Sequence, residues 1–175
     1  MDQDRPQTHR GPKPRRRTLL LWRHAKSDWD DAALSDFERP LAARGRQAAP
    51  AMARWIAAEW PPDRVLCSPA RRTVQTWEAL APLLPATLPV CFDARAYLAD
   101  AASLRALVAA TPAETATLLL IAHNPGLEQL AAGLAEPVGR KFPTAAVAVL
   151  QFKGDWQDLA ASAARLVAFR RPKDL

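Results

Sequence analysis

The first clear hydrophobic pattern in this chain is a run of four apolar residues, 19–22, which is followed directly by Arg23 and His24. A continuous apolar run without polar alternation is typical of a parallel strand that is covered on both faces. Ligands of open parallel sheets bind beyond the carboxyl ends of the strands. The pattern therefore predicts a buried strand that presents Arg23 and His24 where a small anion could bind.

Two further runs, each of which is expected to form a short strand, repeat this arrangement. Residues 63–67 lead into Ser68, and residues 117–122 lead into His123. Because the carboxyl ends of parallel strands meet at one edge of a sheet, we expect these polar residues to lie near Arg23 and His24.

The segment 42–60 has the spacing of an amphipathic helix, with Met52 and Ile56 among its recurring apolar residues. Pro50 interrupts this segment. Because a proline inside a helix costs about 3 kcal/mol, we expect a bend there or two abutting helical pieces.

The junctions after the second and third runs have the sequence of helix starts. Ser68 precedes Pro69, and Asn124 precedes Pro125. Each pair predicts an N-cap residue followed by proline at the first helical position. The expected helices end near residues 80 and 134, and a further short helix is expected over 103–110.

Three more strands complete the prediction. One is expected near 90–92, and the segments 145–152 and 164–169 read as the two strands of a hairpin-like edge. Strands that alternate with helices predict an α/β fold with a mostly parallel central sheet flanked by helices. A chain of 175 residues is long enough for one well-buried core.

Charge is concentrated at the beginning of the chain. The formal net charge is +6, and residues 1–17 hold six basic and two acidic residues. We interpret 1–17 as a basic, disordered, solubilising tail and 18–175 as a single domain. No nucleic-acid-binding motif accompanies this charge, so we expect no nucleic-acid partner. Attraction of phosphate by the tail remains an alternative.

Cys67 and Cys91 have neither metal-ligand nor redox-pair spacing, which fits a reducing compartment. No apolar stretch is long enough to span a bilayer. We therefore expect a cytoplasmic protein without membrane association or bound metal, and we expect a monomer.

The predicted sheet edge collects Arg23, His24, Ser68, Arg72 and His123. Guanidinium groups bind phosphate oxygens bidentately and stay charged at any working pH. Helix N-termini at the same edge favour anions as well. Two Arg and two His are a sufficient set of donors for a tetrahedral phosphate without a metal. One His could be the nucleophile if its other ring N–H is held by a carbonyl or carboxylate.

Three motifs in order carry a family resemblance: Arg23-His24, the stretch 68–76 (SPARRTVQT) and the stretch 122–128 (AHNPGLE). Together they resemble the histidine phosphatase superfamily (phosphoglycerate mutase-like), and within it the small SixA-type phosphohistidine phosphatases. The similarity extends from about residue 19 to the C-terminus. It implies a three-layer α/β sandwich and no cofactor.

By this resemblance, His24 would be the nucleophile that becomes transiently phosphorylated, and Arg23 would grip the phosphate. Arg72, and not Arg71, would be the second phosphate-binding arginine, because the family spacing is Ser-Pro-x-x-Arg. His123 would contact the phosphate and stabilise its charge. Ala25 and Ala122 stand where glycine is common in the family.

The general acid is the least defined role. Asp36 is our candidate, and a solvated loop carboxylate is the alternative for the same residue. Glu38, Asp28 and Asp93 are further options. An imidazole leaving group needs less help from an acid than an alkoxide, so a poor acid favours phosphohistidine as the substrate.

Three more residues are candidates for substrate binding. Ser27 could hydrogen-bond the phosphate or act as a cap, and Lys141 and Thr144 could border the pocket opposite the nucleophile.

We therefore expect a metal-independent phosphohistidine phosphatase that acts on a phosphorylated protein. A phosphatase of small phosphorylated molecules, which would need a competent acid, is one alternative. A module that binds phosphohistidine or a phosphopeptide without turnover is the other.

Overall fold

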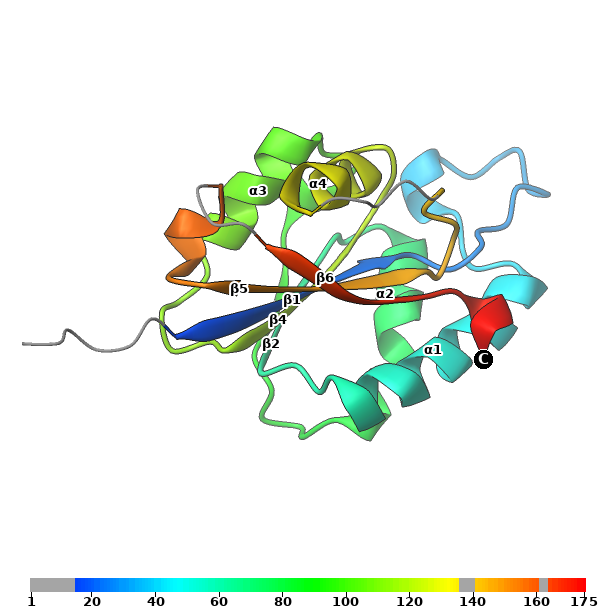
Figure 1. Ribbon diagram of the computed structural model, residues 1–175. Coiled ribbons are helices and arrows are strands. Elements are labelled where there is room, and N and C mark those ends of the chain that lie inside the picture. The colour runs from blue at the N-terminus through cyan, green and yellow to red at the C-terminus, as the bar shows by residue number, and fades with distance from the viewer. Residues whose placement is uncertain (1–14, 136–140, 161–163) are drawn as a thin grey trace, which may run out of the picture.

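The computed structural model describes residues 15–135, 141–160 and 164–175, in which six strands form one sheet between two layers of helices (Figure 1). The strands are β1 (Arg16–Arg23), β2 (Arg64–Cys67), β3 (Val90–Phe92), β4 (Thr117–Ala122), β5 (Val147–Lys153) and β6 (Arg165–Arg170). The α-helices are α1 (Ala43–Glu59), α2 (Arg71–Glu78), α3 (Ala101–Ala109) and α4 (Gly126–Leu134). Short 3₁₀ helices are η1 (Asp36–Glu38), η2 (Ala81–Leu83), η3 (Ala94–Ala96), η4 (Trp156–Ala160) and η5 (Pro172–Asp174).

The strand order is β3-β2-β4-β1-β5-β6. Strands β3, β2, β4 and β1 are parallel neighbours, whereas β5 pairs antiparallel with both β1 and β6. The predicted α/β fold with a mostly parallel central sheet is therefore confirmed, and β5 and β6 form the expected antiparallel edge.

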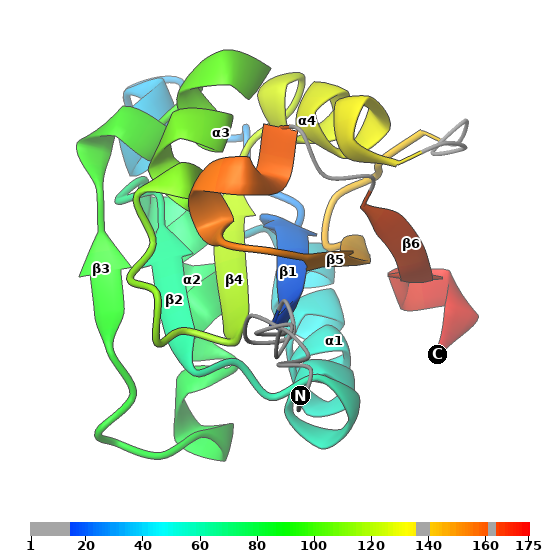
Figure 2. The same cartoon turned by 60° about the vertical axis from the view of Figure 1, so that its left-hand side comes forward.

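The apolar run in β1 is buried on both faces of the sheet. Leu19 and Leu21 pack into the core beneath α3, α4 and η4. Leu20 and Trp22 pack into the opposite core, which α1 covers. Figure 2 shows these two layers on either side of the sheet. Because neighbouring side chains in a strand point to opposite faces, a sandwiched strand needs apolar residues at consecutive positions.

Helix α1 is one continuous helix from Ala43 to Glu59, with Pro50 inside it. The expected division into two pieces is therefore not found. The helix buries Met52 and Ile56 completely in the core. Burying a large aliphatic side chain stabilises by about 1.5–3 kcal/mol, so two such contacts outweigh the roughly 3 kcal/mol that a mid-helix proline costs.

The predicted N-caps Ser68 and Asn124 are wrong. Helix α2 is capped by Ala70 and α4 by Pro125, and neither helix has a side-chain cap. Both predicted caps have other partners. The Ser68 hydroxyl contacts a histidine of the candidate site described below. The Asn124 amide donates to Glu128, within α4, at 2.7 Å. Helix α2 also ends at Glu78, two residues earlier than expected.

Strand β1 begins at Arg16, two residues before the predicted start of the domain at residue 18. The Arg17 side chain is buried, and its guanidinium donates to the carbonyls of Thr115 and Ala113 at 2.6 Å each. It also forms an ion pair with Asp155. These partners explain why a residue that reads as part of a basic tail belongs to the sheet. Residues 1–14 of that predicted tail lie outside the described residues.

Within the described ranges, no helix has both the length and the apolar character needed to cross a membrane.

We predict that Gly126→Ala destabilises the fold. A Cβ at Gly126 would lie 1.9 Å from the backbone oxygen of Ala99, which cannot move aside cheaply. Overpacking of this kind costs about 1–3 kcal/mol of unfolding free energy. Urea unfolding measures the change.

Gly133→Ala in the same helix is the matched control. There the Cβ would lie 3.3 Å from the flexible end of Arg105. Because alanine is the better helix former by about 1 kcal/mol, this variant should be as stable as the wild type or more so. Equal losses in both variants would contradict the close approach at Gly126.

Candidate active site

The candidate site lies at the carboxyl ends of three adjacent parallel strands. Arg23 of β1 is paired in register with Ala122 of β4, and Cys67 of β2 with Ile121. The next residues are His24, His123 and Ser68. The structure thus brings together the polar residues that follow the three apolar runs, and the His24 and His123 rings lie 5.1 Å apart.

The ring of His24 is held in one orientation by the backbone. Its Nδ1 lies 2.8 Å from the carbonyl oxygen of Ala25, so Nδ1 carries the proton and Nε2 keeps its lone pair. Burial lowers the pKa of His24 from 6.5 to about 3. The Ala25 hydrogen bond opposes this shift, whereas the charges of Arg72, Arg23 and Arg39 add to it. His24 is therefore neutral at pH 7.

His123 has two side-chain partners. Arg72 Nη2 donates to its Nδ1 at 3.2 Å, so Nε2 carries the proton and donates to the Ser68 hydroxyl at 2.8 Å. Burial, the neighbouring His24 and the charge of Arg72 lower the pKa of His123 from 6.5 to about 3. The donor Arg72 thus fixes the tautomer of His123, and Ser68 accepts from the ring in that tautomer.

Arg23 is fixed by a small polar network. Its Nη1 donates to the carbonyl of Phe142 at 2.8 Å, and Asn124 donates to the same carbonyl at 3.0 Å. Glu128 accepts from the amide groups of both Asn124 and Phe142. Burial lowers the pKa of Arg23 on balance. The negative charge of Glu128 acts in the opposite direction and raises the pKa of Arg23. This network holds the guanidinium beside the two histidines.

Asp36 holds the Arg72 guanidinium, whose Nη2 also contacts His123. Its Oδ2 pairs with Arg72 Nη2 at 2.9 Å and accepts from the Tyr97 hydroxyl at 2.6 Å, and its backbone carbonyl accepts from Arg72 Nη1. Partial burial acts to raise the pKa of Asp36, but the hydrogen bonds from Tyr97 and Arg72 and the charges of Arg72 and Arg39 lower it on balance. Asp36 is therefore an ionised partner of the arginines.

Arg39 is a third arginine of the site, which the sequence interpretation did not include. It is 7% exposed, pairs with Asp36 Oδ1 at 3.0 Å and stacks on the Trp29 ring at 3.2 Å from its centroid. Its Nη2 also lies 3.4 Å from the Ser27 hydroxyl. The structure thus places Ser27, a predicted phosphate ligand, against this arginine.

Several buried guanidinium donors of the site have no partner among the described residues. They are Nε of Arg23, Nε of Arg72, and Nε and Nη1 of Arg39. A buried donor without a partner costs free energy, more so when it is charged. Three arginines with spare donors beside two neutral histidines therefore form a site that suits a small, multiply charged anion.

The other carboxylates considered for the acid role lie elsewhere. Asp28 accepts from the Asp30 amide, Glu38 accepts from the Ser35 hydroxyl, and Asp93 pairs with Arg95. Among the four candidates, only Asp36 contacts an arginine of the site.

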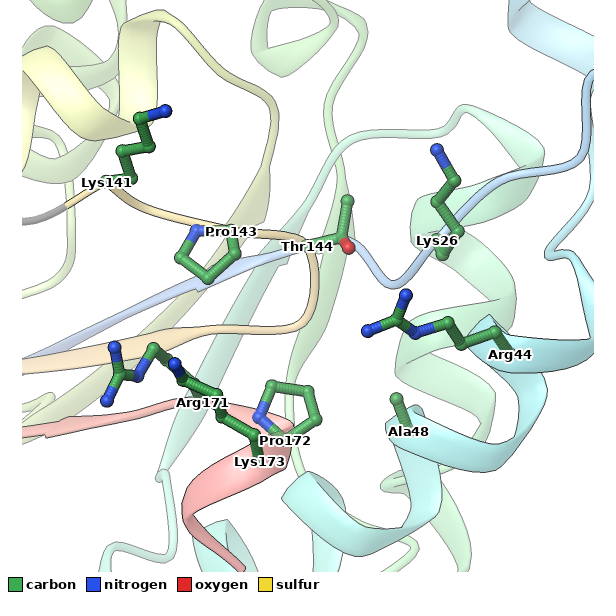
Figure 3. Close-up of a pocket in the computed structure, with 9 residues that line it drawn as sticks. All are labelled: Lys26, Arg44, Ala48, Lys141, Pro143, Thr144, Arg171, Pro172 and Lys173. Atoms are coloured by element: carbon green, nitrogen blue, oxygen red, sulfur yellow. The ribbon is translucent and has the colours of Figure 1, made fainter.

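Lys141 and Thr144 line a pocket of about 610 Å³ (Figure 3). None of the site's histidines or arginines described above lines it. Substrate binding by Lys141 and Thr144 stays a prediction.

Tyr97 is the second residue that sequence interpretation missed. It contacts Asp36, and its ring packs edge-on against His123 at 5.4 Å and against Phe37 at 5.0 Å. It is the only tyrosine of the chain and follows η3, far from the three motifs. Being the single tyrosine of the chain is the one feature that distinguishes Tyr97 in the sequence, and this feature does not predict its contact with Asp36 or His123. Arg39 had a better signal, because it follows Asp36 by three residues within the predicted loop.

We predict that the protein loses stability as the pH falls from about 6.5 toward 3. In the unfolded chain each histidine binds a proton near its ordinary pKa of 6.5, whereas His24 and His123 in the folded protein do so only near 3. The unfolded state therefore binds more protons in this window, and between pH 6.5 and 5 each histidine should remove up to about 2 kcal/mol of unfolding free energy. Urea unfolding at a series of pH values measures this slope.

The matched variants are His24→Gln and His123→Gln, each of which should flatten the slope by about half, whatever its stability at pH 7. The chain's third histidine, His9, provides the control as His9→Gln. A slope that is unchanged in both site variants would show that the two histidines are not held neutral by the fold.

Comparison with known proteins agrees with this arrangement. The family model described as histidine phosphatase superfamily (branch 1) matches residues 19–96. An uncharacterized protein of Mycobacterium tuberculosis is 35% identical over 162 residues, which cover 86% of this chain and 99% of that protein.

Two solved structures have the same fold over nearly their whole length. A Nakamurella multipartitia protein provisionally named phosphohistidine phosphatase SixA is 32% identical, with a TM-score of 0.81 over 92% of this chain and 99% of its own. A protein histidine phosphatase SixA in complex with tungstate is 25% identical, with a TM-score of 0.75 over 90% of this chain and 98% of its own. This chain therefore belongs to the histidine phosphatase superfamily, in its SixA-type branch.

Proposed function

We propose that this protein hydrolyses phosphohistidine on a protein, through a covalent phosphohistidine intermediate at His24. The observation that carries the proposal is the state of the His24 ring. It is neutral, its Nδ1–H is held by the Ala25 carbonyl at 2.8 Å, and its Nε2 has a free lone pair among buried arginines. A nucleophilic histidine requires these conditions.

The phosphoryl group would be held by donors that already stand in place. Arg23 and Arg72 are fixed by Phe142 and Asp36, and both keep an unpartnered buried Nε. During phosphoryl transfer, negative charge spreads over the three equatorial oxygens, and fixed cationic donors stabilise it without reorganisation. His123, which Ser68 and Arg72 hold beside His24, would border the same group.

The proposed reaction has two steps. In the first, His24 Nε2 forms a bond to phosphorus while the phosphorus–nitrogen bond of a protonated phosphohistidine breaks, and a neutral imidazole leaves. The His24 ring keeps its Nδ1 proton and is cationic in the phosphoenzyme. In the second, water attacks the phosphorus, neutral His24 leaves, and dihydrogen phosphate is released.

The ionised state of Asp36 supports phosphohistidine over an ester as the substrate. A carboxylate that is paired with two arginines and accepts from Tyr97 is a poor proton donor. An alkoxide leaving group needs a proton, whereas the imidazole of a protonated phosphohistidine leaves as a neutral group without a further proton. The similarity to a protein histidine phosphatase SixA that binds tungstate, a tetrahedral oxyanion, also supports this assignment.

The first prediction of this proposal concerns His24→Ala. Wild-type protein mixed with a phosphohistidine peptide should form an acid-labile, base-stable phosphoenzyme and release phosphate without added metal. The variant should form none, and its turnover should fall by at least about 1,000-fold, because the nucleophile is gone. With a ³²P-labelled peptide, gel analysis detects the phosphoenzyme, and the released ³²P-phosphate measures turnover.

Arg71→Ala is the control for this experiment, because Arg71 is exposed whereas its neighbour Arg72 is buried. It should keep wild-type turnover. A wild-type protein that binds phosphate yet neither forms a phosphoenzyme nor turns over would instead be a recognition module.

The second prediction separates a positioning role of Asp36 from an acid role. Asp36→Asn removes the charge that holds Arg72, so kcat/KM should fall by about tenfold, the loss expected for one charge-assisted hydrogen bond. The fall should be equal for a phosphohistidine peptide, 4-nitrophenyl phosphate and phenyl phosphate. Glu38→Gln, an exposed carboxylate nearby, should leave all three rates unchanged.

A selective loss on phenyl phosphate, whose leaving group most needs a proton, would assign the acid role to Asp36. It would also favour small phosphate esters as substrates.

A further inference from the structure

Beside the candidate site lies the pocket of about 610 Å³ that Lys141 and Thr144 border (Figure 3). Four segments form it: the chain just after β1, the start of α1, the segment 141–144 and η5. Its size is within the range of about 300–1,000 Å³ that is usual for ligand sites. The function proposed above does not use this pocket.

The charged side chains that line the pocket are all basic. They are Lys26, Arg44, Lys141, Arg171 and Lys173. Arg171 is compensated by an ion pair with Asp174 at 2.8 Å. Among the described residues, the other four have no ion-pair partner within 4 Å. The pocket therefore carries an uncompensated charge of about four, and a ligand with several negative charges would lower the mutual repulsion.

The cations are spread around the pocket. Figure 3 shows Lys26 and Arg44 on one side and Lys141 and Arg171 on the other, with Arg44 extending toward the middle. This differs from the candidate catalytic site, where Arg72 contacts both His123 and Asp36. A single phosphate needs convergent donors, whereas separated cations fit negative charges that are themselves separated along a ligand.

The rest of the lining is apolar or weakly polar: Ala48, Pro143, Thr144 and Pro172. An extended peptide with acidic and apolar side chains matches such a surface. Its carboxylates would pair with the cations, and its aliphatic groups would cover the prolines.

The pocket is next to the nucleophile in the fold. Lys26 is two residues beyond His24. On the other side, Thr144 precedes Ala145, whose amide donates to the carbonyls of Arg23 and His24 at 3.1 and 3.0 Å. A protein whose phosphohistidine reaches His24 would therefore present its neighbouring surface to this pocket.

We infer that this pocket docks an acidic segment of the phosphoprotein substrate. The inference rests on the proposed function, because it names the surface that selects the protein to be dephosphorylated.

A binding experiment tests the pocket without turnover. Fluorescence anisotropy of a labelled hexaglutamate peptide should show binding to the wild type that weakens as salt rises. Arg44→Glu/Lys173→Glu should weaken binding by at least about tenfold, because two ion pairs become repulsive. Arg54→Glu/Arg165→Glu makes the same change in charge at exposed positions outside the pocket and should bind like the wild type.

A turnover experiment tests the link to catalysis. Two synthetic peptides carry the same phosphohistidine, flanked by four glutamates or by four glutamines. The wild type should favour the glutamate peptide in kcat/KM by about tenfold, mainly through KM. The pocket variant should lose this preference while keeping its rate on the glutamine peptide, and the control variant should keep both.

The outcomes are distinguishable. If the wild type hydrolyses the two peptides at equal rates and the pocket variant does the same, the docking inference is wrong and the proposed function stays intact. If neither peptide is hydrolysed, the proposed function is wrong, and hexaglutamate binding alone then tests whether the pocket docks an acidic peptide. If hexaglutamate does not bind but inorganic pyrophosphate does, with loss in the pocket variant, the occupant is a small anion and the inference is wrong.

Discussion

The pairing of β4 with β1 on one side and β2 on the other determines where the chemistry of this protein can occur. Because both ladders are parallel and their last paired residues lie side by side, three chain segments leave the sheet at one edge. Each segment carries a polar residue directly after its strand. The amide of His24 donates to Ala122 and that of Ser68 to Ile121, so the sheet hydrogen bonds themselves set the spacing.

This spacing gathers more positive charge than negative charge in a buried place. Three arginines, Arg23, Arg39 and Arg72, lie around the two histidines. The carboxylate of Asp36 pairs with two of these arginines, Arg39 and Arg72. Burial and the charges of the arginines keep both histidines neutral, and several guanidinium donors have no partner among the residues that the structure describes. Both features cost free energy, and a phosphoryl group bound as proposed would offer acceptors to the unpartnered donors while His24 stays neutral.

The predictable and unpredictable parts of the structure differ in the range of the interactions involved. Continuous apolar runs decide the strands locally, so the places of His24 and His123 follow from the sequence. Capping is also local, yet neither predicted cap forms. The Ser68 hydroxyl contacts the distant His123, and the Asn124 amide group donates to Glu128 and Phe142.

The same competition explains the residues that the sequence interpretation left out or misplaced. Arg17 reads as part of a basic tail, but carbonyls almost a hundred residues away accept from it. Tyr97 contacts Asp36, and no pattern in the segment of Tyr97 indicates that contact, whereas Arg39 follows Asp36 by only three residues. The two groups of cations in this protein can be understood in the same terms. Those fixed by carbonyls and Asp36 converge on the candidate site, whereas those of the pocket are spread out and, apart from Arg171, have no ion-pair partner among the described residues. Under the proposed function and the docking inference, the first group would determine the rate and the second the choice of partner, so the two properties could change independently.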